Sequence, residues 1–205
     1  MIDIVWFFMR NESKPKSARR IIPLIHAVTL LAFILAFAFG CRPDEPSLSP
    51  ATLSLKTRIQ TNLDLFIPEL AENIHKKRRK KITSILDSFY AQLNGPGASC
   101  PFSLALLDNH GVNITNRTQE SFSGSQNYGN YQVVSNVLQK KRTFTSSLYL
   151  QSGGKVYIIC VPLIGSEKLL GVIVIGIDSV FLRQSGITES QFMSMDFNSQ
   201  ATSTP

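Results

Sequence analysis

Hydrophobic and polar positions along the chain form two helical stretches and then a series of short strand-like runs. Between residues 52 and 66, apolar residues recur every three or four positions, which predicts a helix. Pro68 interrupts this pattern, and a second helical pattern covers residues 69–93. The turn residues NGPG at 94–97 then end the helical region.

The region after residue 100 alternates apolar runs with turns, which is typical of antiparallel strands joined by hairpins. A polar, glycine-containing segment at 116–130 suits a lid over a pocket. The expected elements are strands at 102–107, 112–115, 143–150, 155–163 and 169–177, and helices at 131–141 and 179–184. Residues 185–205 are polar and are predicted to be a frayed tail.

The N-terminal segment has the pattern of an export signal. Residues 10–20 are basic and polar, and residues 21–40 are almost entirely apolar. The sequence AFGC that ends at Cys41 resembles the lipobox of bacterial lipoproteins, which implies that Cys41 is lipidated and becomes the mature N-terminus. Phe39 departs from the small residue usual in that motif. Met9 begins a more conventional signal than Met1 does.

An uncleaved membrane anchor is the alternative interpretation, because twenty apolar residues at about 1.5 Å each are just long enough to span a bilayer. Both interpretations place the rest of the chain on the periplasmic side, since the basic flank stays inside. By resemblance to enterobacterial lipoproteins, Arg42 favours the outer membrane, and an inner-membrane anchor is the alternative. The predicted organisation is a signal or anchor segment (1–40), a Pro/Ser-rich linker (41–51), one domain (52–184) and the tail (185–205).

The charge of the chain changes this picture little. The formal net charge is +7, but the residues after position 40 hold 16 basic and 12 acidic groups, a net charge of +4. The basic character therefore belongs partly to the export signal, and no nucleic-acid-binding motif accompanies it. A nucleic-acid partner is not expected.

A second basic run, HKKRRKK at residues 75–81, lies within the second helical pattern. Six consecutive cations spread around a helix, so a solvated, exposed face is one interpretation. Contact with anionic lipid headgroups or with an acidic partner is the other.

The residues that carry chemistry in enzymes are not arranged in a recognisable way. Three cysteines are too few for a disulfide framework, and the three histidines show no spacing typical of zinc ligands. The SGG sequence at 152–154 precedes a strand rather than a helix, which excludes a phosphate-binding loop. We therefore expect no enzyme activity, no metal and no cofactor.

Two stretches of the sequence resemble the bacterial Cache family of extracytoplasmic, PAS-like sensor domains. LALLDNHGVNIT, from Leu104, is similar to the first hairpin of that family, with an apolar strand, Asp-x-x-Gly and a return strand. GGKVYIICVPLIGSEKLLGVIVIGID, which ends at Asp178, is similar to its last hairpin. The resemblance covers residues 52–184, and only one such unit fits in the chain.

This resemblance implies an α+β fold: a long N-terminal helix packed on a five-stranded antiparallel sheet with strand order 2-1-5-4-3. With that order, Cys100 and Cys160 are too far apart for a disulfide, so both are predicted to be free, with Cys160 a buried apolar residue. The resemblance also implies a small-molecule pocket on one face of the sheet and a homodimer formed through the 52–93 helix. The sequence shows no output domain, so we expect a signal to pass to a separate membrane protein.

The expected ligand is a small organic molecule, with a carboxylate or an amino acid as candidates, and its polar partners would come from the lid and nearby strands. Arg117 is the preferred anion partner because its planar guanidinium matches a carboxylate. Asp178 ends the last strand and either caps the tail helix or contacts a ligand amine. The candidate binding residues are Arg117, Tyr128, Tyr131, Tyr149, Lys155, Tyr157 and Asp178.

Two functions fit the sequence. The first is a membrane-anchored sensor that binds a small periplasmic molecule under the 116–131 lid. The second is a structural or interaction lipoprotein of the cell envelope, with the same fold, a filled interior and a functional surface at residues 75–81.

Overall fold

The computed structural model describes residues 48–96, 100–118, 127–150 and 154–198. The export segment, Cys41 and the predicted linker up to residue 47 lie outside the described residues, as do residues 119–126 of the predicted lid and residues 199–205 of the tail. Residues 46–205 form a compact unit of the chain.

The centre of the domain is a five-stranded antiparallel sheet with the order β2-β1-β5-β4-β3. This confirms the predicted α+β class and strand order. The two longest strands, β4 and β5, form a hairpin at the middle of the sheet, and β1 pairs with the free side of β5. The strands are β1 (Phe102–Asp108), β2 (Asn113–Arg117), β3 (Phe144–Tyr149), β4 (Lys155–Gly165) and β5 (Lys168–Asp178).

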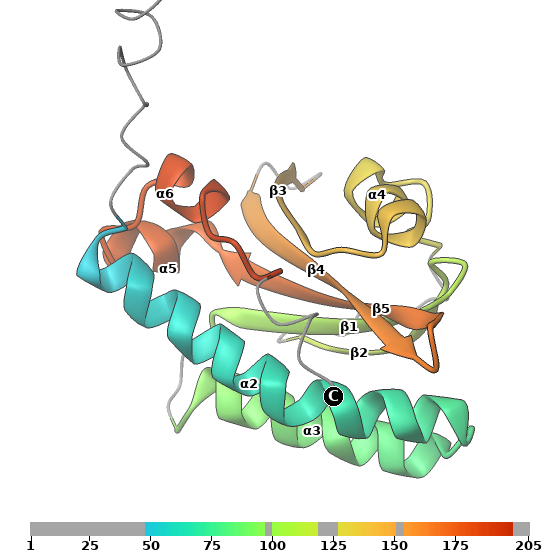
Figure 1. Ribbon diagram of the computed structural model, residues 1–205. Helices are drawn as coiled ribbons and strands as arrows, with labels where there is room; N and C mark the ends of the chain where they lie inside the picture. The colour runs from blue at the N-terminus through green and yellow to red at the C-terminus, as the bar shows by residue number, and fades with distance from the viewer. Residues whose placement is uncertain (1–47, 97–99, 119–126, 151–153, 199–205) are drawn as a thin grey trace, which may run out of the picture. The chain divides into compact units, whose positions relative to one another are not determined.

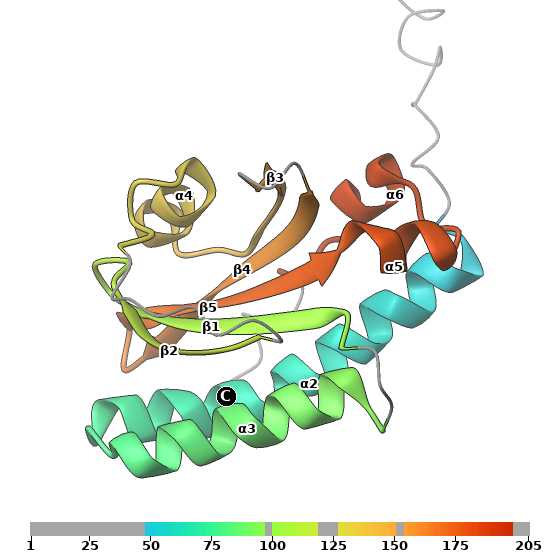
Figure 2. The same cartoon turned by 180° about the vertical axis from the view of Figure 1, so that it is seen from behind.

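Helices cover both faces of the sheet (Figure 1). On one face, α2 (Pro50–His75) and α3 (Arg79–Asn94) run as an antiparallel hairpin along the strands. On the other face lies α4 (Gln132–Lys140), as the view from behind also shows (Figure 2). Two short helices, α5 (Ser179–Gln184) and α6 (Glu189–Met193), follow β5 at one end of the sheet.

The helical hairpin differs from the sequence-based expectation in where it breaks. Pro68 lies inside α2, and the chain turns instead at Lys76–Arg78, where Lys77 adopts a left-handed φ of 53°. Phe66 and Leu70 are buried on either side of Pro68, so tertiary packing outweighs the one hydrogen bond that proline removes. Like charges four positions apart, such as Lys76 and Lys80, disfavour a helix that continues through the basic run.

The larger hydrophobic cluster lies between the helical hairpin and the sheet. The buried positions of α2, from Leu55 to Leu70, recur every three or four residues and so form one stripe. Phe66 of α2 stacks on Phe89 of α3, with ring centroids 5.0 Å apart. Each fully buried side chain of this kind contributes about 1.5–3 kcal/mol of transfer free energy.

The C-terminal segment, expected to be frayed from residue 185, is packed into this cluster as far as residue 198. A capping box on Thr188 starts α6, in which Phe192 is fully buried against Tyr157, and Met195 and Phe197 are buried beyond it. The side-chain amide of Asn198 then pairs with both backbone groups of Thr143, at 2.7 and 3.3 Å. The few apolar residues of this polar segment are enough to hold it against the domain, because Ile187, Phe192, Met195 and Phe197 are all buried.

A smaller hydrophobic cluster fills the other face of the sheet, beneath α4. Cys160 of β4 is fully buried in it, and burial raises the pKa of its thiol to about 12. Cys100 and Cys160 are both free, as predicted, and Cys160 acts as a small apolar residue.

Candidate ligand cavity

A cavity of about 220 Å³ lies between the sheet and the chain leading into α4. Its floor comes from alternate positions of β1, β4 and β5, because successive side chains of a strand point to opposite faces. Its roof comes from Tyr128, Tyr131 and the start of α4. The floor residues on these three strands include Ser103, Ala105, Leu107, Val156, Ile158, Val174 and Gly176.

Two small residues leave the space for this cavity. Ala105 of β1 pairs with Val174 of β5, and both line the floor. A Cβ atom on Gly176 would lie 2.3 Å from the Ser103 hydroxyl oxygen, so glycine lets the two strands keep that hydroxyl at the cavity wall. The cavity therefore exists because these two floor residues have small side chains or none.

The polar groups at the cavity are neutral. Ser103, Asn116 and Thr118 reach it from β1 and the end of β2, and Tyr128 and Tyr131 reach it from the roof. Burial, with a further contribution from Tyr131, raises the pKa of the Tyr128 phenol, which therefore stays protonated at neutral pH. None of the described residues that line the cavity is charged.

The β1–β2 turn holds the roof in position. The Asp108 carboxylate accepts hydrogen bonds from the backbone N–H groups of His110 and Val112, at 2.8 and 2.9 Å. Gly111, with a φ of 81°, then offers its carbonyl to the N–H of Tyr128 at 2.8 Å. The Asp-x-x-Gly sequence therefore forms a turn that also holds Tyr128, near the C-terminal end of the predicted lid.

The roof tyrosines are packed on each other. The rings of Tyr128 and Tyr131 stack with centroids 5.9 Å apart and planes 29° apart. Tyr128 is half-buried and Tyr131 is 47% exposed, so the pair extends from the cavity to the surface. A ligand in the cavity would meet the inner side of this pair.

The structure brings together only part of the predicted set of binding residues. Tyr128 and Tyr131 line the cavity, whereas the four residues chosen from the strands turn towards the opposite face. These four are Arg117, Tyr149, Lys155 and Tyr157. The expectation that they share one pocket with the lid is therefore corrected, and the reason is the two-residue period of a strand: each of them is one position out of phase with the cavity.

Arg117 and Lys155 have other partners. The Arg117 guanidinium forms an ion pair with Asp87 of α3. The Lys155 ammonium lies 2.5 Å from the carboxylate of Glu189 in α6, and this hydrogen bond raises the pKa of Lys155 and lowers that of Glu189. Both residues join the sheet to a neighbouring helix.

The aromatic and acidic candidates also have structural partners. Lys155 lies over the rings of Tyr149 and Tyr157, 5.3 and 5.2 Å from their centroids. Asp178 is the N-cap of α5, and its carboxylate accepts from the N–H of Val180 at 2.8 Å. Capping is thus the role that Asp178 has in the structure.

Sequence reasoning missed Ser103, Asn116 and Thr118, which are the polar residues of the strand side of the cavity. One signal could have found them. Gly176 follows four bulky, β-branched residues in β5, and a glycine within a strand often marks the close approach of a ligand or of another chain segment. Positions that share its face would then have been the candidates.

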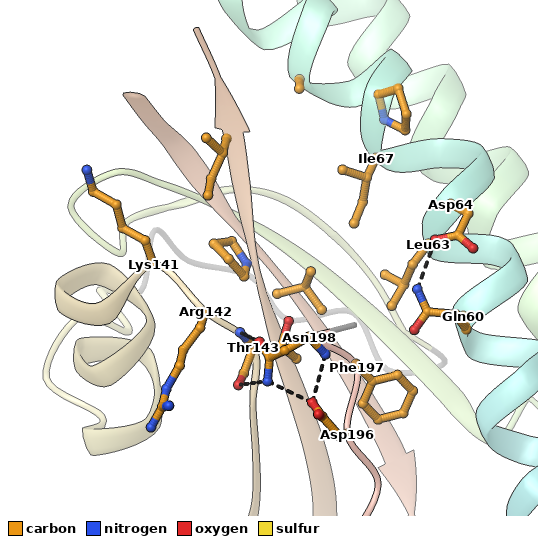
Figure 3. Close-up of a pocket in the computed structure, with 15 residues that line it drawn as sticks. Gln60, Leu63, Asp64, Ile67, Lys141, Arg142, Thr143, Asp196, Phe197 and Asn198 are labelled. Carbon is orange, nitrogen blue, oxygen red and sulfur yellow. Dashed lines mark hydrogen bonds between the residues drawn. The ribbon is translucent and has the colours of Figure 1, made fainter. Parts of the chain in front are cut away.

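A second, larger groove of about 750 Å³ lies between α2, β4 and the C-terminal segment (Figure 3). Gln60 donates to Asp64 at 2.8 Å on its α2 side, so these two polar groups already pair with each other. Lys141 and Arg142 extend away from α2. Asn198 donates to Asp196 at 2.9 Å and also pairs with the backbone of Thr143, so these polar groups are bonded to one another as well. The cavity under α4 is therefore the better ligand site.

No family model matches the chain, and no curated protein sequence matches it. Solved structures do match its fold. The extracellular domain of the histidine kinase vpHK1S-Z8 aligns with a TM-score of 0.52 at 12% identity, over 65% of this chain and 54% of that chain. An extracellular ligand-binding receptor from Desulfohalobium retbaense gives a TM-score of 0.49 at 9% identity, over 66% of this chain and 26% of that chain.

The sensor domain of the histidine kinase DctB from V. cholerae gives a TM-score of 0.43 at 17% identity, over 67% of this chain and 61% of that chain. This chain spans between a quarter and about three fifths of the length of these three proteins. At such identities the likeness concerns the fold. The fold is shared with the extracellular domain of the histidine kinase vpHK1S-Z8.

Within the described ranges, no helix has the length and apolar character needed to cross a membrane. The apolar segment 21–40 lies outside those ranges. The described residues also contain no group of three or more His, Cys, Asp or Glu residues that could hold a metal ion.

Proposed function

We propose that this chain is an extracytoplasmic sensor domain that binds a small, uncharged organic molecule in the cavity under α4. The observation that carries the proposal is the 220 Å³ cavity, lined by apolar side chains and by five neutral polar residues. A mostly apolar cavity with a few fixed hydrogen-bonding groups is the usual form of a small-molecule site. The fold supports the proposal, because the extracellular domain of a histidine kinase shares it.

The chemistry of the cavity argues against a carboxylate ligand. A buried ionised group needs a charged or strongly hydrogen-bonding partner, because leaving it unpaired costs several kcal/mol or more. The described lining has no cation, and the segments that follow Thr118 and Leu150 in sequence, residues 119–126 and 151–153, contain no Lys, Arg or His. Hydroxyl and amide groups instead suit a ligand with an alcohol, a carbonyl or an amide.

The size of the cavity limits the ligand further. At about 30 Å³ for each water in the liquid, the cavity has room for about seven waters. A compact molecule such as a small ring or a branched chain with one or two polar atoms fits this volume. Its apolar part would lie on Val156, Ile158 and Val174, and its polar part would face Ser103 and Asn116.

The export signal supports a membrane-attached form of this sensor. Attachment would be through a lipid on Cys41 or through an uncleaved 21–40 helix, and the bound state would be reported to a membrane protein. Mass spectrometry of the mature N-terminus distinguishes the two forms of attachment. A lipid-modified cysteine at position 41, lost in Cys41→Ala, supports the lipoprotein.

A thermal-shift screen of residues 46–205 tests the ligand-binding proposal, with a library that pairs neutral alcohols, ketones, lactones and amides with the corresponding acids and amines. A ligand at about 100 times its dissociation constant adds about 2.7 kcal/mol of stability. We expect a shift from neutral compounds and none from their charged counterparts. A shift from carboxylates alone would overturn the assignment of ligand class.

Variants then locate the site. Ala105→Phe fills the cavity and should abolish the shift while the protein stays folded, and Tyr128→Phe should reduce it by removing one hydroxyl. Arg117→Ala is the matched control, because Arg117 lies on the other face and should leave binding unchanged. A folded domain that responds to no compound would instead favour the structural or interaction lipoprotein.

A further inference from the structure

The tip of the α2–α3 hairpin concentrates positive charge at one point of the surface. Six consecutive cations, Lys76 to Lys81, occupy the turn after α2 and the first three residues of α3, and all six are exposed. Figures 1 and 2 show this turn at the free end of the hairpin. We name residues 76–81 the cationic tip.

The domain neutralises little of this charge. Lys76 forms an ion pair with Glu72 one helical turn earlier, and Arg78 also acts on the Glu72 carboxylate by its charge. In the part of the chain that the structure describes, no ion pair is recorded for Lys77, Arg79 or the two lysines that follow. The cationic tip therefore keeps a large net positive charge.

The three cations within α3 do not stabilise the helix that they begin. Arg79, Lys80 and Lys81 form the first turn of α3, where the helix dipole is positive and acidic residues are favoured. The N-cap residue, Arg78, makes no side-chain capping bond, and the first turn holds no acid. Three cations at the start of a helix, with no ion pair among the described residues to compensate, are typical of a surface under a functional constraint.

We infer that the cationic tip docks on the headgroups of an anionic phospholipid membrane. Four of its six residues are lysines, and lysine is depleted in protein–protein interfaces, where aromatic residues and arginine dominate. The tip has no aromatic residue, and none of its residues lines either the cavity or the groove described above. A dense, convex group of flexible cations instead matches a diffuse negative surface.

The contact is electrostatic. None of the exposed large apolar residues of the described chain lies in the tip, so there is no side chain to insert among the acyl chains. Salt at about 0.5 M should therefore release the protein, because it screens charges over a few ångström. The inference rests on the tip itself and does not require the cavity to bind a ligand.

Vesicle co-sedimentation of residues 46–205 tests the inference without the apolar export segment. The probes are vesicles of phosphatidylcholine alone and of phosphatidylcholine with about 30 mol% phosphatidylglycerol, at low salt and at 0.5 M NaCl. We expect binding to the anionic vesicles at low salt only. Each cation near such a surface strengthens binding about fivefold. The affinity for anionic vesicles should therefore fall at least about a hundredfold in the variant that combines Lys77→Gln, Arg78→Gln, Lys80→Gln and Lys81→Gln.

The matched control removes four exposed positive charges elsewhere: Lys140→Gln, Arg142→Gln, Lys168→Gln, Arg183→Gln. It has the same net charge as the tip variant and should retain most of the binding. Equal losses in the two variants would mean that net charge alone attracts the protein, and the inference would fail. A wild-type fragment that ignores anionic vesicles would also overturn it and would direct the search to an acidic protein partner.

Discussion

The backbone N–H of Tyr128 donates to the carbonyl oxygen of Gly111 at 2.8 Å, which ties the roof of the cavity to the turn between β1 and β2. Gly111 and Gly129 approach so closely that a Cβ atom on Gly111 would lie 2.6 Å from the Cα and N atoms of Gly129. The cavity roof therefore depends on a residue without a side chain in a distant hairpin.

Gly111→Ala should destabilise the domain through both strain and collision. Alanine at a φ of 81° costs about 1 kcal/mol, and the contact with the Gly129 backbone adds about 1–3 kcal/mol more. Gly186→Ala is the control, since Gly186 has a φ of 71° and nothing within 4 Å of its added Cβ. Urea unfolding of both variants should show the larger loss at Gly111; equal losses would mean that the Gly111–Gly129 approach is unimportant.

Phe192→Ala should lower the free energy of unfolding by about 3–5 kcal/mol, because this ring is fully buried and packs edge-on against Tyr157 at a centroid distance of 5.1 Å. Ser190→Ala, on the exposed side of the same helix, should change it by less than about 0.5 kcal/mol. Thermal or urea unfolding measures both. A small effect of Phe192→Ala would contradict the packing of the C-terminal segment into the core.

Cys160 should make the domain less stable in alkali. Burial raises the pKa of its thiol from an ordinary 9.0 to about 12, so between these values the unfolded chain loses a proton that the folded chain keeps. The unfolded state then binds fewer protons, and the free energy of unfolding falls with pH, by up to about 1.4 kcal/mol per pH unit.

Urea unfolding at several pH values between 8 and 10.5 should show this fall in the wild type and a shallower one in Cys160→Ala. Thiol alkylation at neutral pH supplies a separate check. Native protein should be modified at the half-buried Cys100 and not at Cys160, and unfolded protein at both. Rapid labelling of Cys160 in the native state would show that the β4 face is open to solvent.

Lys80→Glu should stabilise the domain by about 0.5–1 kcal/mol, because an acid in the first turn of α3 interacts favourably with the helix dipole and with the neighbouring cations. The same change at Lys140, in the last turn of α4, should act in the opposite direction. Melting temperatures of the two variants test this sign reversal. A loss of stability in Lys80→Glu would show that the cationic tip contributes to the fold.

Several features of the fold could be predicted from the sequence because they depend on local patterns. Period-two and period-3.6 patterns located the strands and helices, and Asp108 and Gly111 marked the first hairpin turn. The order of these elements, compared with a known family, was enough for the strand order β2-β1-β5-β4-β3. The isolation of Cys100 from Cys160 followed from that order.

The helix break and the packed C-terminal segment could not be predicted, because both depend on partners far away in sequence. Pro68 stays within α2 since the flanking Phe66 and Leu70 are buried against the sheet and α3. Phe192 is held by Tyr157, 35 positions earlier in the chain. Local propensity alone predicts a helix break at Pro68 and a frayed segment around Phe192.

The sequence by itself determined where most strands and helices lie, because periodicity and turn residues are local, and the order of these elements, through its resemblance to a known family, indicated the α+β class. Only the tertiary structure decided which face of the sheet holds the cavity. Strands β4 and β5 are apolar on both faces, so their pattern does not distinguish residue 155 from residue 156. Neighbouring residues of a strand point to opposite faces, one towards the cavity and the next towards the helical hairpin. The packing of α4 against one face decides which residues line the cavity.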